Sequence, residues 1–342
     1  MKKFFSAVLA VIMVLALVAC GSNQASSAAS ASTPASDSPA SSASSAEVKV
    51  EPITVRISAG PSGGNNFLIC AAFADQMMKT FPEYTISAEI SNGTAQNIRA
   101  TAENEAQMCV AMSDGAMYAY EAGREYTDLE AGQFAYVAGG YQTIIHFMVP
   151  ANSSVESIYD LKGSKIAASQ GTTCQYYLPN VLEAYGMTTD DVEVTQLQLA
   201  DMMNALSDGT VDAAMHITSY PLAAISDVAA TKGIKILNIV DKEAEYIHEN
   251  YPFFSPMIIA GGSYQGISED VQTIGTLNTL ICRSDLSEEF VYNFVKTIME
   301  NNDTLKNVHP KCGDFNLDNT LTGAVIPIHP GAEKYYKEAG IL

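Results

Sequence analysis

The sequence predicts an α/β protein whose two lobes are joined by a hinge of two extended segments. Residues 48–342 are too many for one typical hydrophobic core. Along them, stretches rich in β-branched residues alternate with stretches that carry apolar residues at helical spacing, which is typical of a mostly parallel sheet. The alternation stops near Pro150 and then restarts, so we expect two α/β lobes in tandem.

The first lobe is expected to begin with three strand–loop–helix repeats. Each predicted strand is short and apolar, and small polar residues separate it from the following helix. The predicted strands are 53–58, 84–90 and 107–112, and the helices are 65–80, 94–104 and one capped by Ser113 and Asp114.

The second lobe repeats this pattern with shorter elements. Its predicted strands are 164–168, 192–197, 211–217 and 234–240, and its predicted helices are 155–161, 175–185, 200–207 and 220–231.

Two long apolar stretches, 134–149 and 253–264, fit the two crossings of a hinge. The chain would leave the first lobe near Pro150 and return near Phe254. Residues 286–342 then read as mostly helical cover for the first lobe. The expected organisation is therefore 48–149 plus 254–342 for lobe one and 150–253 for lobe two.

The N-terminus has the pattern of an export signal. Lys2 and Lys3 precede an apolar run, 4–18, that is too short to span a bilayer with polar flanks. Cys20 follows Ala19 directly, an arrangement similar to the lipobox of bacterial lipoproteins. We expect residues 1–19 to be a signal peptide and Cys20 to carry a lipid; an ordinary cleaved signal beside a chance cysteine is the alternative.

Residues 22–46 consist almost entirely of Ser and Ala. Such a segment buries too little apolar surface to offset the entropy of ordering it. We therefore predict that residues 20–47 tether the folded part to the membrane through Cys20, with a glycosylated stalk as the alternative.

The chain is strongly acidic, with a formal net charge of −20. This charge argues against nucleic acid and against an anionic membrane surface as partners. Nothing in the sequence demands more than a monomer.

The sequence offers little for catalysis, metal or cofactor binding. Its six cysteines include no CxxC pair or Cys/His cluster, so we predict mostly buried thiols, with a Cys282–Cys312 disulfide left open. The five histidines are scattered; His216 reads as a buried histidine and His329 as a surface one. No nucleophile–base motif is present, so we expect neither an enzyme nor a cofactor.

Small polar residues gather at the predicted strand-to-helix turns 60–66, 91–97, 113–114, 169–175 and 218–220. In parallel sheets such turns share the carboxyl edge of the strands. The helix N-termini there present free N–H groups that attract carboxylates. A simple capping role is the alternative for each loop taken alone, and Asp114 could instead meet a ligand ammonium group. The candidate ligand contacts are Gly63, Gly64, Asn65, Asn97 and Ser113 from lobe one and Thr172, Thr173, Gln175 and Ser219 from lobe two.

Several of these loops resemble the solute-binding proteins called TAXI, the extracytoplasmic immunogenic proteins associated with TRAP transporters. The similarity runs from about residue 53 to the C-terminus. The matching stretches are 57–64, 91–97, 113–116, 251–254 and 329–336, together with the less specific 158–163 and 205–214.

The resemblance implies a bilobal, type II periplasmic-binding-protein-like fold without enzymatic activity. It also implies capture of a small anionic solute, a dicarboxylate or an acidic amino acid such as glutamate or 2-oxoglutarate. The solute would pass to the membrane subunits of a TRAP transporter, at the outer face of the cytoplasmic membrane.

The chain departs from the family pattern at two places. Asn65 and Asn66 stand where aromatic residues are common, and Cys174 stands where glycine is usual. A more polar pocket is expected, so the specific ligand does not carry over. A binding protein of an ABC importer is the alternative function, followed by a surface interaction protein.

Overall fold

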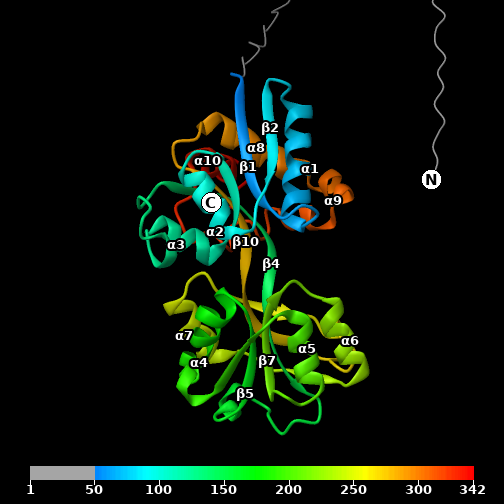
Figure 1. Cartoon of the computed structure of the whole chain (residues 1–342). Coiled ribbons are helices and arrows are strands. Elements are labelled where there is room, and N and C mark those ends of the chain that lie inside the picture. The colour runs from blue at the N-terminus through cyan, green and yellow to red at the C-terminus, as the bar shows by residue number, and fades with distance from the viewer. Residues whose placement is uncertain (1–50) are drawn as a thin grey trace, which may run out of the picture. The chain divides into compact units, whose positions relative to one another are not determined.

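The computed structural model describes residues 51–342, and the chain from Lys49 to Leu342 forms one compact body (Figure 1). The predicted signal peptide, Cys20 and the whole of the predicted tether lie outside the described residues. No helix among residues 51–342 has the length and apolar character that crossing a bilayer requires.

A ten-stranded mixed sheet organises the described residues, in the order β2-β1-β3-β10-β4-β7-β5-β6, with β8 beside β4 and β9 beside β10. The strands are β1 (Ile53–Gly60), β2 (Tyr84–Ile90), β3 (Met108–Met112), β4 (Phe134–Pro150), β5 (Lys165–Ser169), β6 (Glu193–Leu197), β7 (Ala213–Thr218), β8 (Ile234–Ile236), β9 (Ser255–Ile259) and β10 (Val271–Arg283).

Pairing within the sheet changes direction in its middle. The triplets β2-β1-β3 and β7-β5-β6 are parallel, whereas β10 and β4 are antiparallel to each other and to their neighbours β3 and β7. Two parallel α/β units are therefore joined through two long antiparallel strands. This arrangement confirms the predicted fold class, two α/β parts connected by two extended strands.

Helices surround the opposite ends of β4 and β10 (Figure 1). We call β1–β3 with their helices and the C-terminal helices the first unit, and β5–β9 with their helices the second unit. The helices of the first unit are α1 (Asn65–Thr80), α2 (Thr94–Ala102), α3 (Ser113–Tyr120), α8 (Glu288–Glu300), α9 (Asn302–Val308) and α10 (Pro330–Glu338). Those of the second unit are α4 (Leu178–Ala184), α5 (Leu199–Ser207), α6 (Ala223–Thr231) and α7 (Asp241–Asn250).

Each unit has its own hydrophobic core on both faces of the sheet. In the first unit, one cluster packs α1, α8 and α10 on the sheet, and another packs α2 and α3. In the second unit, α4 and α7 cover one face while α5 and α6 cover the other. The predicted cover from residues 286–342 is confirmed for α8 and α10, which pack into the first core.

The second crossing differs from its prediction. Residues 253–264 do not cross between the units; β9 lies within this stretch and pairs with Val271–Gly275 of β10. The crossing strand is β10, whose second half pairs with β3 and β4. Its threonines, glycine and asparagine give β10 a polar sequence, although every residue from Thr273 to Cys282 is buried.

The crossing strands are irregular where the units meet. The register of β10 against β4 shifts between Leu277 and Thr279, opposite Gln142 and Gly139. Such a bulge locally bends a strand. The irregularity lies between the cores of the two units, because Tyr141 belongs to the first core and Ile144 to the second.

Two smaller predictions concern cysteine and histidine. Among the described residues all five cysteines are free and buried, which confirms the expected small apolar role and leaves no Cys282–Cys312 disulfide. His329, expected at the surface, is buried instead. It caps α10 by accepting the Gly331 N–H at Nδ1, and its Nε2 lies 3.0 Å from the Leu286 carbonyl oxygen.

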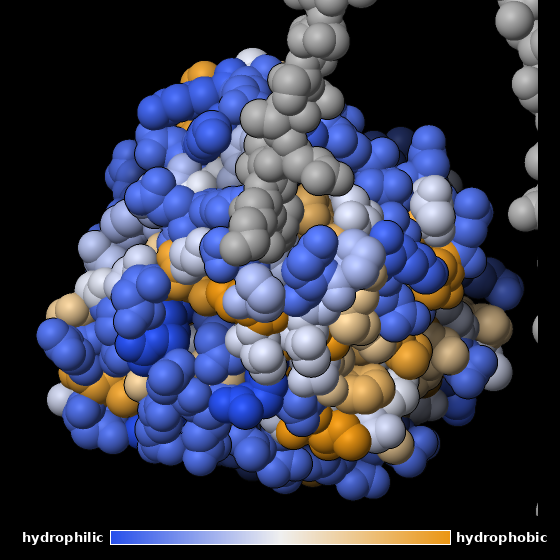
Figure 2. All heavy atoms as spheres, turned by 90° about the horizontal axis from the view of Figure 1, so that it is seen from above, coloured by the Kyte–Doolittle hydropathy of each residue, from blue (hydrophilic) through white to orange (hydrophobic). Residues whose placement is uncertain are grey.

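The surface seen from above is mainly hydrophilic, with small apolar areas between polar side chains (Figure 2). Scattered exposed apolar residues are normal for a folded protein.

Candidate functional site

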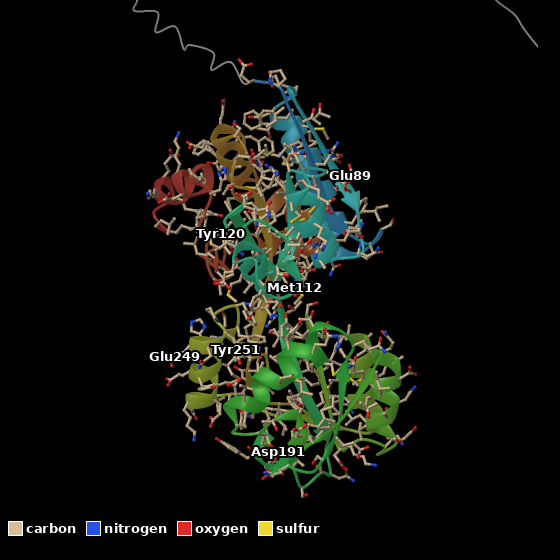
Figure 3. The ribbon with its side chains drawn as sticks, turned by 60° about the vertical axis from the view of Figure 1, so that its left-hand side comes forward. Glu89, Met112, Tyr120, Asp191, Glu249 and Tyr251 are labelled. Atoms are coloured by element: carbon tan, nitrogen blue, oxygen red, sulfur yellow. The ribbon has the colours of Figure 1, made fainter. Side chains whose placement is uncertain are left out.

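The carboxyl ends of β1, β3, β5 and β7 all lead into turns that the sequence singled out. Of these strands, β1 and β3 belong to the first unit and β5 and β7 to the second. Met112, at the end of β3, packs against the core of the second unit, so these strand ends face the junction (Figure 3).

The first loop positions the start of α1. Gly63 has a φ of +78°, a conformation that favours glycine, and Gly64 is the N-cap of the helix. Asn65 is exposed at the first helical position. Its neighbour Asn66, which was not among the predicted contacts, donates to Asn278 Oδ1 at 3.3 Å and accepts the Tyr141 hydroxyl at 2.8 Å. The loop is thereby fastened to both crossing strands.

Asn97 is a structural residue rather than a ligand contact. Its Nδ2 donates to the carbonyl oxygens of Ala59, at 2.9 Å, and Val110, at 2.6 Å. Its Oδ1 accepts the hydroxyls of Ser58 and Ser91. The side chain is buried, and all of its bonds tie β1, β3 and the second loop together. No capacity is left for a solute.

Ser113 is likewise engaged within the protein. It is fully buried, its hydroxyl donates to the Leu277 carbonyl oxygen at 3.2 Å, and it accepts the Leu277 N–H at 3.4 Å. It fixes the start of α3 to β10 at the bulge. The adjacent Asp114 is also buried, and burial raises the pKa of its carboxyl group.

The corresponding loop of the second unit leads into a π-helical turn, η3 (Thr173–Tyr177). Thr172 is half-buried and Thr173 is buried, while Gln175 is exposed and its N–H bonds the Gly171 carbonyl oxygen at 2.9 Å. π-helical turns are rare in proteins, and those that occur are often found at functional sites. Beside it, Ser169 at the end of β5 bonds His216 Nδ1 in β7.

A polar cavity of about 360 Å³ combines residues of both units. Gln142 comes from the crossing strand β4, Ser219 follows β7 of the second unit, and Lys311 and Asp314 belong to the C-terminal part of the first unit. Its lining residues are Gln142, Ile144, Ser219, Tyr220, Lys311, Asp314 and Asn319.

Of the described residues, Lys311 is the one cationic side chain that lines this cavity, and Asp314 is the one anionic side chain. The Lys311 ammonium group lies 3.1 Å from Asp314 Oδ2 and 5.8 Å from the centre of the Tyr141 ring. Both members of the ion pair are about one-third exposed, so they remain in contact with solvent.

Of the predicted contacts, only Ser219 lines this cavity. The sequence reasoning missed Lys311, Asp314 and Asn319 because they follow no strand of the parallel units. Their signal was a cluster of Asn, Asp, Lys and Gly at 311–319, within the segment 286–342 that was predicted to be mostly helical.

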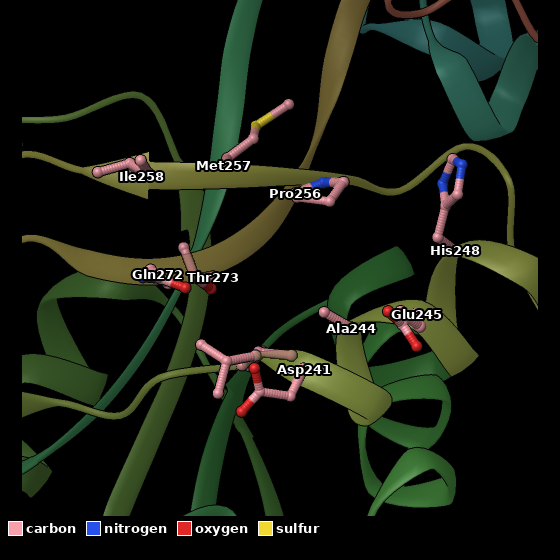
Figure 4. A pocket seen from close by; sticks show the side chains of 11 residues that line it. Asp241, Ala244, Glu245, His248, Pro256, Met257, Ile258, Gln272 and Thr273 are labelled. Atoms are coloured by element: carbon pink, nitrogen blue, oxygen red, sulfur yellow. The ribbon is translucent and has the colours of Figure 1, made fainter.

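A different cavity, of about 390 Å³, lies inside the second unit between α7, β9 and β10 (Figure 4). Asp241, Glu245 and His248 stand on its α7 side, and Pro256, Met257 and Ile258 on its β9 side. None of the predicted contacts lines it. Within residues 51–342 no group of three or more His, Cys, Asp or Glu side chains is placed to hold a metal ion.

The chain is similar to several solved binding proteins at low identity. Against the periplasmic aliphatic sulphonate binding protein SsuA of Escherichia coli, the identity is 17%, 84% of this chain and 79% of that chain are covered, and the TM-score is 0.49. Against the putative sulfonate-binding SsuA of Methylobacillus flagellatus KT, the identity is 16%, 85% of this chain and 89% of that chain are covered, and the TM-score is 0.47. Against a putative L-cystine ABC transporter of Listeria monocytogenes, the identity is 13%, 77% of this chain and 95% of that chain are covered, and the TM-score is 0.44.

A family match covers far more than half of the sequence. The NMT1-like family matches residues 57–340, which span both units and both crossing strands. The chain therefore belongs to the NMT1-like family.

Proposed function

We propose that this protein is an extracytoplasmic solute-binding protein, not an enzyme, that holds a small anionic organic solute between its two units. The observation that carries the proposal is the polar cavity of about 360 Å³, which Ser219 lines from one unit and Lys311 from the other. A solute that bonds both units favours the state in which they are together, and this difference in affinity drives closure.

The two units act as lobes that move about β4 and β10 in this proposal. The sequence predicted lobes of 48–149 plus 254–342 and 150–253; we place the return to the first lobe not at Phe254 but at the bulge of β10 near Leu277. The bulge and the facing residue Gln142 would absorb the change in backbone angles.

Solute contacts are proposed from both lobes. Lys311 supplies a charge-assisted bond to a carboxylate. The backbone at Gly63 and Asn65, and the residues Thr172, Thr173, Gln175 and Ser219, would supply further donors, whereas the Gly64 N–H already bonds the Pro61 carbonyl oxygen at 2.9 Å. Asn97 and Ser113 are no longer among them, because their side chains already bond the protein.

We propose the transporter and the anchor from the sequence. The TAXI-like loops favour membrane subunits of a TRAP transporter as partner, and Cys20 would hold the protein at the outer face of the cytoplasmic membrane. Mass spectrometry of the mature N-terminus tests the anchor, since an unmodified residue there other than Cys20 would contradict it.

Uptake in vesicles that contain TRAP subunits, compared with vesicles that contain an ABC permease and its ATPase, decides the transporter class.

A thermal-shift screen tests the solute class. L-Glutamate, L-aspartate, 2-oxoglutarate and succinate would be compared with L-glutamine and glucose. A solute at 100 times its Kd stabilises a folded protein by about 2.7 kcal/mol. We expect stabilisation by one or more of the four anions; a shift with the neutral compounds alone would contradict the proposed charge of the solute.

Replacing Lys311 by methionine is expected to weaken binding of the anionic solute about 10- to 100-fold, because a hydrogen bond to a charged group contributes about 1.5–3 kcal/mol. Isothermal titration calorimetry measures the change. Lys306→Met is the matched control, since Lys306 is exposed on α9 and does not line the cavity. Equal affinities of the two variants would exclude Lys311 from the site.

A further inference from the structure

Arg124 joins the two units on a face that the polar cavity does not reach. It begins η1 (Arg124–Tyr126), directly after α3 in the first unit, and only 12% of its side chain is exposed. Its φ of +48° lies in the left-handed region, which non-glycine residues occupy rarely and only when their surroundings hold them there.

The Arg124 guanidinium is stacked between aromatic rings of both units. Its central carbon lies 3.7 Å from the centre of the Tyr118 ring, in α3 of the first unit. On its other side it lies 4.0 Å from the centre of the Tyr176 ring, in η3 of the second unit. Phe253 of the second unit lies 5.6 Å away. A planar guanidinium stacks well in this way, and the attraction grows when water is excluded.

A carboxylate completes the cluster. Asp114 Oδ2 lies 3.5 Å from Arg124 Nη1, and only 7% of the Asp114 side chain is exposed. The Tyr177 hydroxyl, from the second unit, is buried beside the Asp114 carboxyl group. The rings of Tyr118 and Phe253 also meet across the junction, with 6.0 Å between their centres.

We propose that Arg124 is a latch: it holds the two units together on this face through Tyr176, independently of any solute. Arg124 belongs to the first unit and Tyr176 and Phe253 belong to the second, so the contact forms in the closed state and is lost when the units separate. None of them lines the polar cavity. The inference rests on the proposed function, because a latch matters only in a protein whose units move apart.

The latch sets how much of the protein is closed before a solute arrives. When a contact forms only in the closed state, its whole free energy favours the closed over the open state. For a desolvated cation–π sandwich, loss of the contact should change the ratio of closed to open molecules about 10-fold or more.

The distance between two spin labels tests the latch without any solute. Cysteines would replace Glu121, next to Tyr120 on the first unit, and Glu249 on the second unit; both glutamates are exposed, and Tyr120 and Glu249 lie on the same side of the molecule (Figure 3). The five native cysteines of the described residues are buried, and Cys20→Ser removes the remaining thiol, so only the introduced cysteines react.

We expect the short distance to predominate in the parent and in Tyr176→Phe, which keeps the ring. Tyr176→Leu and Arg124→Ala should each add a longer distance. Arg99→Ala is the matched control: Arg99 pairs with Asp128 at 2.8 Å and lies 5.9 Å from the Tyr126 ring centre, all within the first unit, so its loss should leave the distance unchanged.

Identical distance distributions for Tyr176→Leu and Tyr176→Phe would overturn the latch, even if Arg124→Ala proves unstable. The same holds if Arg99→Ala lengthens the distance as much as Arg124→Ala does. The distances are measured without solute, so they test the latch even if no compound in the thermal-shift screen binds. If a compound does bind but the variants leave the distances unchanged, the latch is refuted and the proposed function is not.

Discussion

Replacing Asn97 by alanine is expected to lower the free energy of unfolding by about 3–5 kcal/mol. The change leaves the buried carbonyl oxygens of Ala59 and Val110 without donors and the hydroxyls of Ser58 and Ser91 without their acceptor. Each buried polar group left without a partner costs about 1–3 kcal/mol. Urea unfolding at neutral pH measures the difference.

Asn250→Ala is the matched control for this variant. Asn250 is an exposed residue at the end of α7 whose Nδ2 donates to the Tyr246 carbonyl oxygen at 2.9 Å. Its loss should change stability by less than about 0.5 kcal/mol. An Asn97→Ala protein that keeps its stability but loses solute binding would restore Asn97 as a ligand contact and refute the structural role.

Acid is expected to destabilise the protein through His146, by about 2–3 kcal/mol between pH 7.5 and pH 4.5. His146 is buried in β4, with Nδ1 2.9 Å from the Ile144 carbonyl oxygen and Nε2 3.0 Å from the Tyr264 hydroxyl. The Tyr264 oxygen also accepts the Leu222 N–H at 3.1 Å. The Tyr264 hydroxyl hydrogen is thus available for a bond to His146 Nε2. Nε2 can accept this bond only in the neutral ring.

Burial lowers the pKa of His146 to about 4, from about 6.5 in an unfolded chain. Between these values the unfolded state binds more protons, so the stabilisation is fully present above about pH 6.5 and is lost as the pH falls toward 4. Urea unfolding of the parent and of His146→Gln across this range measures the contribution, because glutamine does not titrate. The same loss of stability in both proteins would contradict the assignment.

The regular parts of the fold could be predicted because local pattern and tertiary structure agree there. The strands that became β1, β2, β3, β5, β6 and β7 are short apolar runs bounded by turn residues, and the structure places each within a few residues of its prediction. Helix α7 was missed, since its sequence from Asp241 to Asn250 is mostly polar and only one side of it reaches the core.

The second crossing could not be predicted from hydrophobicity. In β10, Thr276 and Asn278 are buried because the units close over them, which is a property of the junction and not of the strand. The stretch 253–264 is more apolar, yet it lies in the second unit.

The candidate site was predictable only in part. The turns at strand ends were recognisable, but an amide such as that of Asn97 has the same sequence signal whether it meets a solute or the backbone carbonyls of its own sheet. The cavity wall from Lys311 to Asn319 reaches the junction through the packing of the C-terminal segment. Its polar cluster indicates a loop but does not indicate that the loop lies at the junction. Arg124 likewise acquires its role only when Tyr176 is brought opposite to it.

The most direct measurement of the central claim is calorimetric titration of the Ser219→Trp protein with whichever anion from the screen stabilises the parent. Ser219 lines the cavity between the units, so an indole there should fill it and reduce affinity at least 100-fold while the protein stays folded. Ser154→Trp is the control, because Ser154 lines a cavity of about 430 Å³ that lies wholly within the second unit. Retained affinity in Ser219→Trp, or equal losses in both variants, would show that the solute does not bind between the units.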